Sequence, residues 1–435
     1  MATQFSITEG RKWKAPFFTI WTGQAISLLG SQLVQFALIW YLTQRTSSGT
    51  VLAIATLVGL VPQVFIGPFL GALVDRWNRR VIMIVSDGVI ALATIGLAVL
   101  FALGTPQIWH IYLLMFIRSL AGGFHYNAMG ASTSLMVPKE NLPRIQGLNQ
   151  TLQGGMNVLS APLGALLLEV LPMQGVLAID VFSAAFAIVP LFFIAVPQPE
   201  RIISADNGGS NTSMWDDLRE GLRYVRTWPG LLTMLIMAAL INFLITPGFS
   251  LLPLLIKDHF GGGAPQLAAM NSGWGIGVIA GGLLLGVWGG FKRQIATSML
   301  GLIVMGAATA VIGFLPAGLF LAAIAAMLLA GIFNVMTNGP IMGVLQAAVD
   351  PQMQGRVFTL ISSACSAMMP IGLIVAGPLS DLVGIQAWFI VGGIVCVLMG
   401  LAGFFVPALM SLADGHPNQE IAEQVILEAQ PAAAD

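Results

Sequence analysis

Long apolar runs separated by short polar intervals make up most of this 435-residue sequence. A helix needs about 20 consecutive apolar residues to cross the hydrocarbon core of a bilayer. Twelve runs reach that length, with approximate bounds 16–43, 50–73, 81–103, 107–136, 143–171, 174–196, 230–256, 267–290, 294–315, 318–347, 356–381 and 385–410. Open strand edges would leave backbone groups unpaired in lipid, so we expect every run to be helical. The sequence therefore predicts an all-α integral membrane protein with twelve transmembrane helices.

The scarcity of charge supports the same prediction. Charged residues make up 9% of the chain and hydrophobic residues 57%, whereas soluble domains carry about 25% charged residues. A net charge of −1 without a basic tract gives no indication of a nucleic-acid partner. Cys365 and Cys396 both lie inside apolar runs, which favours small buried side chains over a disulfide or metal ligands.

No sequence pattern indicates a cofactor, a metal ion or catalysis. There is no Walker sequence, and we interpret the stretches "GGGAP" and "GGLLLG" as loop and helix-packing glycines. The four histidines form neither a zinc pattern nor a Ser-His-Asp arrangement. We therefore expect no cofactor, no metal and no enzymatic activity. Active transport by such a chain would have to draw on an ion gradient.

Lysine and arginine fall almost entirely on one side of the expected membrane. Of the 18 such residues, only Arg45 and Lys257 lie on the opposite side, and Arg118 lies within a span. Loops rich in lysine and arginine stay in the cytoplasm. The bias predicts a multi-pass protein of the inner or plasma membrane with both termini in the cytoplasm.

The longest polar interval, 197–229, divides the apolar runs into two sets of six. It begins with a flexible linker rich in Pro, Gly, Asn and Ser, and continues as "SMWDDLREGLRYVRTW", which has the spacing of an amphipathic helix. We interpret this helix as a connector. The stretches "LMVPKENLPRIQGLNQTL" and "QAAVDPQMQGRVFTLISS" enter equivalent spans of the two sets, which indicates a parallel repeat. The predicted organisation is an N-terminal six-helix half at 1–196, a cytoplasmic linker at 197–229, a C-terminal half at 230–410 and a disordered cytoplasmic tail at 411–435.

The interval after the second run contains "GALVDRWNRR", which is similar to the signature Gly-x-Leu-x-Asp-Arg-x-Gly-Arg-Arg of the major facilitator superfamily. The stretches "GQAISLLGSQLVQFALIWYLT", "FIRSLAGGFH", "AIDVFSA", "AGGLLLGVWGGF", "GRVFTLISS" and "MPIGLIVAG" resemble the macrolide-efflux branch of its drug:proton antiporters. This resemblance covers nearly the whole chain in order. It implies the major facilitator fold, with two pseudo-symmetric six-helix halves, a substrate site at their interface and export by alternating access.

The same resemblance implies a cytoplasmic gate. Its expected residues are Asp75, Arg76, Arg79, Arg80, Gly355 and Arg356. The carboxylate of Asp75 would face the positive N-terminus of the eleventh span. The arginines would either hold the loop against the anionic leaflet or simply set the topology. Asn78 replaces the glycine of the signature, and asparagine tolerates the left-handed backbone of a tight turn.

Ionisable residues within a span are costly in lipid and therefore point to function. The expected proton-coupling residues are Asp180, Asp87, His125 and Arg118. Arg118 and His125 are seven residues apart and so share one helix face. Asp180 could instead be a fixed structural partner of Arg118 or of a backbone group. The acids at the outer ends of spans, Glu169, Asp258 and Asp381, are expected to be solvated.

Amide side chains recur along single faces of the first, fifth, seventh and tenth spans. Such stripes can bond helices to one another or line a cavity. The resemblance favours a cavity, because these spans face the centre of the implied fold. The expected substrate-binding residues are Gln24, Gln35, His125, Met129, Gln153, Asn157, Asn242, Asn334 and Asn338.

These features together predict a monomeric, proton-coupled exporter of amphiphilic drugs, with macrolide antibiotics as the expected substrates. Its partners would be the small-molecule substrate, protons and membrane lipid. Two alternatives stay open. One is export of an endogenous siderophore, lipid or peptide, and the other is a receptor or membrane scaffold that uses the same fold without transporting anything.

Overall fold

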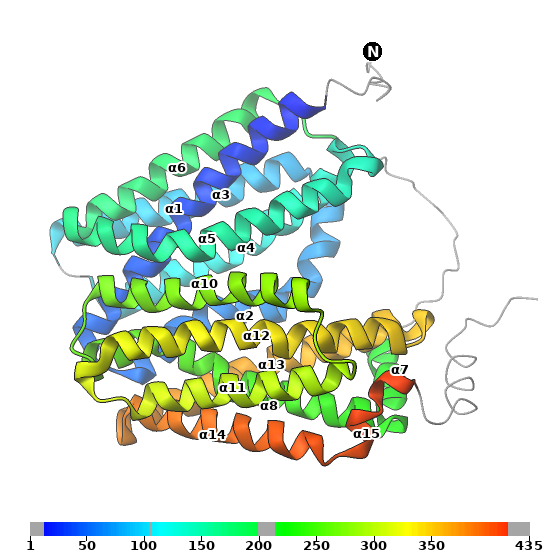
Figure 1. Ribbon diagram of the computed structural model, residues 1–435. Helices are drawn as coiled ribbons and strands as arrows, with labels where there is room; N and C mark the ends of the chain where they lie inside the picture. Colours follow the sequence, from blue (N-terminus) through cyan, green and yellow to red (C-terminus); the bar gives the residue numbers. More distant parts are fainter. Residues whose placement is uncertain (1–12, 105, 199–213, 416–435) are drawn as a thin grey trace, which may run out of the picture. The chain divides into compact units, whose positions relative to one another are not determined.

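The computed structural model describes residues 13–104, 106–198 and 214–415, except for the side chains of 63–76, 214–218 and 414. Within these ranges every regular element is a helix (Figure 1). The chain forms two compact units. The first comprises the described residues of Met1–Arg45 and Ala55–Ile202, and the second comprises those of Thr46–Ile54 and Ile203–Asp435. Most of the predicted C-terminal tail, 416–435, lies outside the described residues.

The first unit is built from long helices that follow the first six apolar runs. They are α1 (Lys14–Thr46), α2 (Gly49–Arg76), α3 (Arg79–Leu103), α4 (Ile108–Met136), α5 (Leu142–Val170) and α6 (Met173–Phe193). A short 3₁₀ turn, Lys139–Asn141, leads into α5. The start of α2, up to Ile54, belongs to the second unit, and the rest of α2, from Ala55 on, belongs to the first.

The second unit begins with a short helix in the predicted linker and continues with six long ones. Its elements are α7 (Met214–Thr227), α8 (Pro229–Ser250), α9 (Leu252–Leu254), a π-helical turn (Leu255–His259), α10 (Ala264–Trp288), α11 (Gln294–Phe314), α12 (Phe320–Ala348), α13 (Pro351–Val383), α14 (Ile385–Phe404) and α15 (Pro407–Met410). Two 3₁₀ turns, Ala317–Leu319 and Leu412–Asp414, complete it.

Each predicted run overlaps one of the long helices, as expected for membrane spans. Among the described residues, nine helices are long and apolar enough to cross a membrane. Three further long helices, α2, α4 and α5, are not among them. The all-α membrane class is therefore confirmed, while the count of twelve spans stays a prediction.

The helix α7 occupies the stretch predicted to be amphipathic. Its residues Tyr224 and Val225 are fully buried, as is Trp228 just after it. They join a hydrophobic core with side chains from α8, α11, α12 and α13. The connector is therefore packed firmly against the helices of the second unit.

Two helix starts follow from single polar side chains. Asn78 is the N-cap of α3, and its Oδ1 accepts hydrogen bonds from the backbone N–H groups of Arg80 and Val81. Its φ of −69° is not left-handed, so the reason expected for this asparagine was wrong: it serves as a cap. Asp350 caps α13 in the same way by accepting a hydrogen bond from the N–H of Gln352, before Pro351 at the first helical position.

Helices α1 and α6 approach each other closely at two glycines. A Cβ added to Gly23 would overlap the backbone oxygen of Phe186, and one added to Gly30 would overlap the side chain of Ser183. Small residues at such positions let membrane helices pack backbone to backbone. The close approach brings Ser31 of α1 next to Asp180 of α6.

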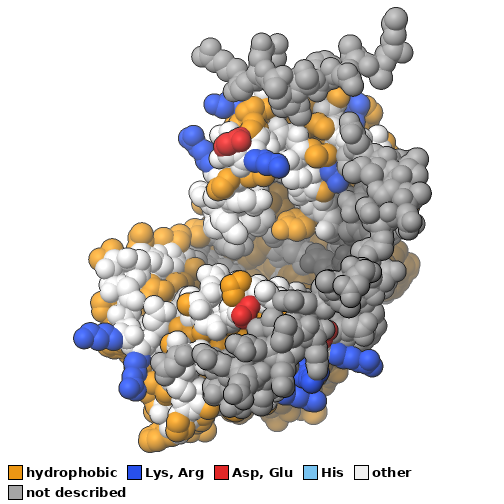
Figure 2. All heavy atoms as spheres, turned by 90° about the vertical axis from the view of Figure 1, so that its right-hand side faces the viewer, with side chains coloured by type: hydrophobic (Ala, Val, Ile, Leu, Met, Phe, Trp, Pro, Cys, Tyr) orange, Lys and Arg blue, Asp and Glu red, His pale blue; other side chains and the backbone are white. Residues whose placement is uncertain are grey.

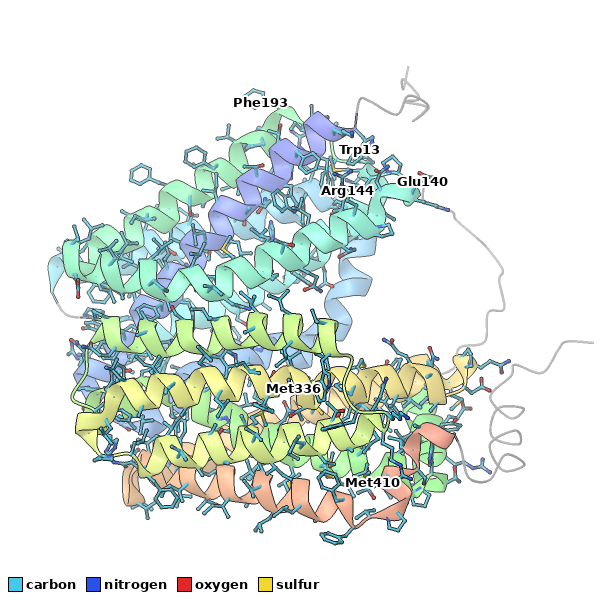
Figure 3. All side chains as sticks on the ribbon, viewed as in Figure 1. Trp13, Glu140, Arg144, Phe193, Met336 and Met410 are labelled. Carbon is cyan, nitrogen blue, oxygen red and sulfur yellow. The ribbon has the colours of Figure 1, made fainter. Side chains whose placement is uncertain are left out.

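Charged side chains gather at the helix ends that the sequence predicts to be cytoplasmic. In the first unit, Trp13 before α1 and Glu140 and Arg144 near the start of α5 lie at the same end (Figure 3). Figure 2 looks onto this end of the first unit, where lysine and arginine side chains are visible.

Candidate functional site

Three helices of the first unit each carry two polar side chains seven residues apart. These pairs are Gln24 and Ser31 on α1, Asp87 and Thr94 on α3, and Arg118 and His125 on α4. Seven residues make about two helical turns, or about 10.5 Å along the axis. The spacing therefore creates two polar layers. We call Ser31, Thr94, Arg118 and Asp180 the outer layer, and Gln24, Asp87 and His125 the inner layer, after the predicted sides of the membrane.

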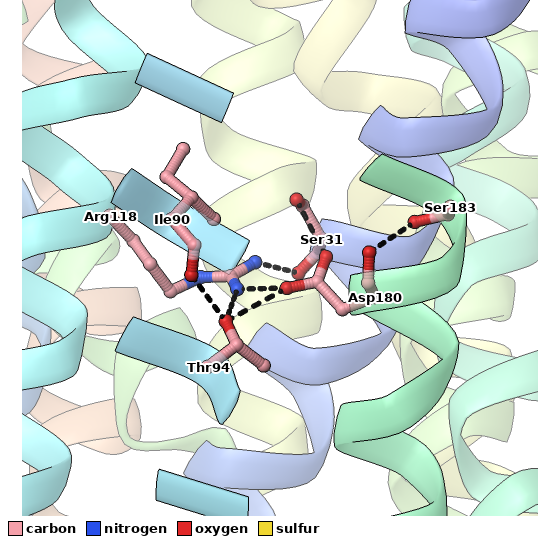
Figure 4. Close-up of polar contacts among 6 residues, drawn as sticks. All are labelled: Ser31, Ile90, Thr94, Arg118, Asp180 and Ser183. Atoms are coloured by element: carbon pink, nitrogen blue, oxygen red, sulfur yellow. Dashed lines mark hydrogen bonds and ion pairs between the residues drawn. The ribbon is translucent and has the colours of Figure 1, made fainter. Parts of the chain in front are cut away.

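The outer layer is organised around an ion pair between Arg118 and Asp180 (Figure 4). The side chain of Asp180 is 2% exposed and that of Arg118 9%. Oδ1 of Asp180 accepts a hydrogen bond from the Ser31 hydroxyl at 3.0 Å. Arg118 also donates to the Thr94 hydroxyl at 3.1 Å and to the backbone oxygen of Ser31 at 3.2 Å. Each charge therefore meets the opposite charge together with further polar groups.

Thr94 joins α3 to this pair. Its hydroxyl lies 3.2 Å from Oδ2 of Asp180 and 2.8 Å from the backbone oxygen of Ile90. The single hydroxyl proton can be donated to one of these acceptors at a time. All four helices, α1, α3, α4 and α6, are thus connected through one buried cluster.

The inner layer contains two titratable groups. Nε2 of His125 lies 3.6 Å from Oδ2 of Asp87, and the two side chains are 17% and 7% exposed. Gln24 donates a hydrogen bond of 3.3 Å to the same carboxylate oxygen. Within the part of the chain that the structure describes, Nε2 of His125 has no hydrogen-bond partner. Among the described side chains, the imidazole of His125 is the group that can balance the charge of Asp87, and it does so when it is protonated.

The structure thus brings all four expected coupling residues into two pairs. The pairing of Asp180 with Arg118 is the alternative that the sequence left open, whereas the pairing of Asp87 with His125 was not predicted. Thr94 was missed altogether. The sequence feature that could have identified Thr94 is its seven-residue spacing from Asp87, which parallels the spacing of Arg118 and His125.

Two arginines of the signature segment bind backbone oxygens of neighbouring helices. Arg80 donates to the backbone oxygens of Leu191 and Phe192 at the end of α6. Arg79 donates to the backbone oxygen of Ala131 in α4 at 2.8 Å and is 6% exposed. Leu191 and Phe192 lie in the last turn of α6, where carbonyl groups lack helical partners and cations are favoured. These arginines hold the ends of α3, α4 and α6 together, a role that neither expected alternative included.

The other expected gate residues are only partly described. The side chains of Asp75 and Arg76 lie outside the described residues. Arg356, in the second turn of α13, forms an ion pair with Glu220 of α7, with 3.1 Å between Nη1 and Oε2. Beside it, the backbone of α7 passes close to α13, since a Cβ on Gly221 would lie 3.2 Å from the oxygen of Arg356. A Cβ on Gly355 would meet open space.

The expected substrate-binding residues differ in the burial and hydrogen bonding of their side chains. Gln24 belongs to the inner layer, while Gln35 and Met129 are half-buried. Gln153 and Asn157 on α5 are exposed.

In the second unit, the amides bond locally. Asn242 donates to the backbone oxygen of Ala238 and Asn338 to that of Asn334, each at 2.9 Å. The amide nitrogen of Asn334 lies 3.8 Å from the sulfur of Met305. These bonds leave the amide oxygens of Asn242 and Asn338 as potential acceptors for a ligand.

An all-helical membrane chain with paired charges buried inside its helices has the features of a transporter. The sequence matches the Major Facilitator Superfamily over residues 20–373 and 249–427, and the chain belongs to this family. Macrolide efflux protein A of Streptococcus pyogenes is 34% identical over 388 residues, which cover 88% of this chain and 95% of the relative. Multidrug efflux pump Tap of Mycobacterium bovis (strain BCG) is 26% identical over 425 residues, covering 94% and 97%.

A solved structure shares the fold. The crystal structure of a bacterial homologue of the iron transporter ferroportin, in an inward-facing state, superimposes with a TM-score of 0.66 at 15% identity. The match covers 89% of this chain and 98% of that chain. At this identity the similarity concerns the fold alone. The family and the fold class predicted from the sequence are both confirmed.

Proposed function

We propose that this transporter exports amphiphilic drugs, with macrolide antibiotics as its substrates, and that it exchanges them for protons by alternating access. The observation that carries the substrate class is the 34% identity to a macrolide efflux protein over 88% of the chain. The similarity to a multidrug efflux pump over 94% of the chain supports the broader drug class. The protein would act as a monomer in the inner or plasma membrane, with both termini in the cytoplasm.

The proposed energy source is a proton gradient. A membrane carrier needs a group inside the membrane that can bind and release the coupling ion, and such groups are costly unless they have a use. The first unit holds two pairs inside its helices, Asp87 with His125 and Arg118 with Asp180. Two of these side chains, Asp87 and His125, can gain or lose a proton without breaking a pair with a permanently charged residue.

The proposed substrate site is chemically suited to a large, mostly apolar molecule. Macrolides carry many hydroxyl groups and a protonatable amino sugar on an apolar ring. Binding sites for such ligands combine broad apolar walls with a few hydrogen-bonding groups. The proposed polar contacts are Gln24, Gln35, His125, Gln153, Asn157, Asn242, Asn334 and Asn338, with Met129 as an adaptable apolar contact.

Drug accumulation in cells tests the proposal. The protein is expressed in a bacterium that lacks its main efflux pumps, and intracellular erythromycin is measured with and without a protonophore. We expect lower accumulation in expressing cells and a return to the control level when the protonophore is added. Unchanged erythromycin accumulation, together with altered accumulation of other amphiphiles, would overturn the macrolide assignment and leave the exporter assignment standing.

The same assay separates the alternatives. An exporter of an endogenous siderophore, lipid or peptide would leave every tested antibiotic unaffected while changing the amount of that compound in the medium. A receptor or scaffold would bind a ligand without any change in its distribution across the membrane. The pair of Asp87 and His125 favours transport, because titratable groups inside a membrane are costly and are functional by default.

A further inference from the structure

We propose that the inner layer is the proton-binding centre of this transporter and that the outer layer is a fixed charge pair that positions it. The inference rests on the proposed proton coupling and assigns it to Asp87 and His125. It also excludes Asp180 as the proton carrier, although Asp180 is the more deeply buried of the two acids.

The outer layer is unsuited to proton exchange because its cation is permanent. An arginine side chain does not lose its proton in proteins. If Asp180 were protonated, the guanidinium of Arg118 would remain buried without a counter-charge, which is strongly unfavourable. Asp180 also has the Ser31 and Thr94 hydroxyls within hydrogen-bond distance of its two oxygens, which fixes the position of its carboxyl group. The pair therefore stays charged throughout the cycle.

The inner layer differs because both of its partners can change charge. Histidine is the side chain that ordinarily gains and loses a proton in the physiological range. Without a bound proton, the layer consists of a carboxylate and a neutral imidazole with a net charge of −1. Binding one proton from water, on Nε2 of His125 or on a carboxylate oxygen of Asp87, brings the net charge to zero. Release of that proton to water on the other side restores the starting state.

The distances show how proton binding would move the helices. In the structure, Gln24 of α1 is the hydrogen-bond donor to Asp87, and the imidazole of α4 stands 3.6 Å away. A direct hydrogen bond between Nε2 and Oδ2 needs about 2.7–2.9 Å between these atoms when both are charged. Protonation of His125 would therefore draw α4 and α3 together at this level.

The outer layer supplies the fixed point for that movement. Arg118 lies on the same face of α4 as His125, and Thr94 lies on the same face of α3 as Asp87. Because the outer contacts keep these two helices in register, a small shift at the inner layer is not absorbed by sliding of α3 past α4. Among the described residues, Asp87 and His125 face Gln24 of α1 and, about two helical turns away, the Arg118–Asp180 pair, whose charges cancel.

The test uses the full-length protein in proteoliposomes that contain a pH-sensitive dye. Proton movement on addition of erythromycin is recorded for the wild type, Asp87→Asn, and a double variant, Arg118→Met with Asp180→Leu. Glu169→Gln, an exposed carboxylate at the end of α5, is the matched control. The double variant removes both outer charges at once, since removing one alone would leave an unpaired buried charge. Erythromycin binding to each protein is measured as a function of pH.

We expect Asp87→Asn to bind erythromycin but to move no protons, because the imidazole of His125 then lacks the carboxylate that would balance its charge. Its binding should depend less on pH than that of the wild type, since one of the two titratable groups of the inner layer is lost. The control should move protons as the wild type does. The double variant should move fewer, because it keeps both titratable groups of the inner layer but loses the fixed contacts between α3 and α4. Proton movement by Asp87→Asn, or its loss in a double variant that still binds erythromycin, would overturn the assignment. If the wild type itself transports erythromycin without moving protons, proton coupling fails and the inner-layer assignment falls with it.

Discussion

Asp381, in the last turns of α13, binds Thr50 in the first turn of α2. Its Oδ2 accepts hydrogen bonds from the hydroxyl of Thr50 at 2.6 Å and from its backbone N–H at 3.1 Å. The neighbouring residues Ser48 and Gly49 donate to the same carboxylate. A carboxylate at this position satisfies N–H groups that a helix start leaves unpaired and complements the helix dipole. The Asp381 carboxylate on α13 thus acts as an N-terminal cap for α2, although the two helices are far apart in the sequence.

Replacement of Asp381 should destabilise the protein through this cap. We expect Asp381→Ala to lower the free energy of unfolding by about 1 kcal/mol, as loss of a helix N-cap does. Asp381→Asn should retain part of that energy, because its amide oxygen still accepts hydrogen bonds. Thermal unfolding in detergent measures the change, with Asp258→Ala, an exposed outer acid of the same unit, as the control. Equal stability of Asp381→Ala and the wild type would show that the cap is dispensable.

The gate proposed from the signature is tested at Asp75. We expect Asp75→Asn to be inserted and expressed normally but to lose most of its efflux, because a neutral amide interacts weakly with a helix dipole. Erythromycin efflux is measured against membrane-inserted protein, and Glu140→Gln serves as an exposed acid on the same predicted side. Normal efflux by Asp75→Asn would contradict a gating role.

Arg80 should contribute to the stability of the first unit rather than to lipid binding alone. Its guanidinium binds the oxygens of Leu191 and Phe192, so Arg80→Gln should cost about 1 kcal/mol of stability. Arg144→Gln, an exposed arginine on the same predicted side, should cost much less. Unfolding is compared in neutral detergent, where no anionic lipid is present. A cost for Arg80→Gln that appears only with anionic lipid would favour the leaflet role instead.

Each exposed amide side chain of α5 should make a small, separate contribution to drug export. Each lost hydrogen bond contributes about 1 kcal/mol, so Gln153→Ala and Asn157→Ala should each reduce erythromycin resistance by roughly fivefold without abolishing it. Thr151→Ala on another face of α5 should have little effect, since its hydroxyl bonds to its own helix at Gly147. Resistance is read as the minimal inhibitory concentration at matched expression. Unaltered resistance in both amide variants would remove α5 from the proposed site.

The sequence was sufficient for the fold class because a membrane span is a local property. Length and hydropathy decide whether a run can cross the bilayer, and each predicted run overlaps a helix. The family followed from stretches such as "GALVDRWNRR" and "FIRSLAGGFH", whose order along the chain carries the information. Helix starts depend on nearby residues as well, although Asn78 acts as a cap rather than as the expected left-handed residue.

Side-chain partners were harder to predict because they depend on the rotation and depth of several helices at once. The sequence placed Arg118 and Asp180 at similar depth and could not decide between pairing and proton exchange. It gave no reason to pair Asp87 with His125, which lie on α3 and α4 and are brought together by the packing of these two helices. Asp381 was expected to be solvated, and its bonds to α2 depend on where α13 ends in space.

The central claim, proton-coupled drug export, is tested most directly by transport into vesicles of known composition. Purified protein is reconstituted into proteoliposomes whose interior is made more acidic than the outside. Uptake of labelled erythromycin into these vesicles is then followed over time. The account predicts uptake that requires the gradient, stops when a protonophore is added, and is matched by proton movement out of the vesicles. Uptake of the same size with and without the gradient, in vesicles that contain correctly folded protein, would contradict it.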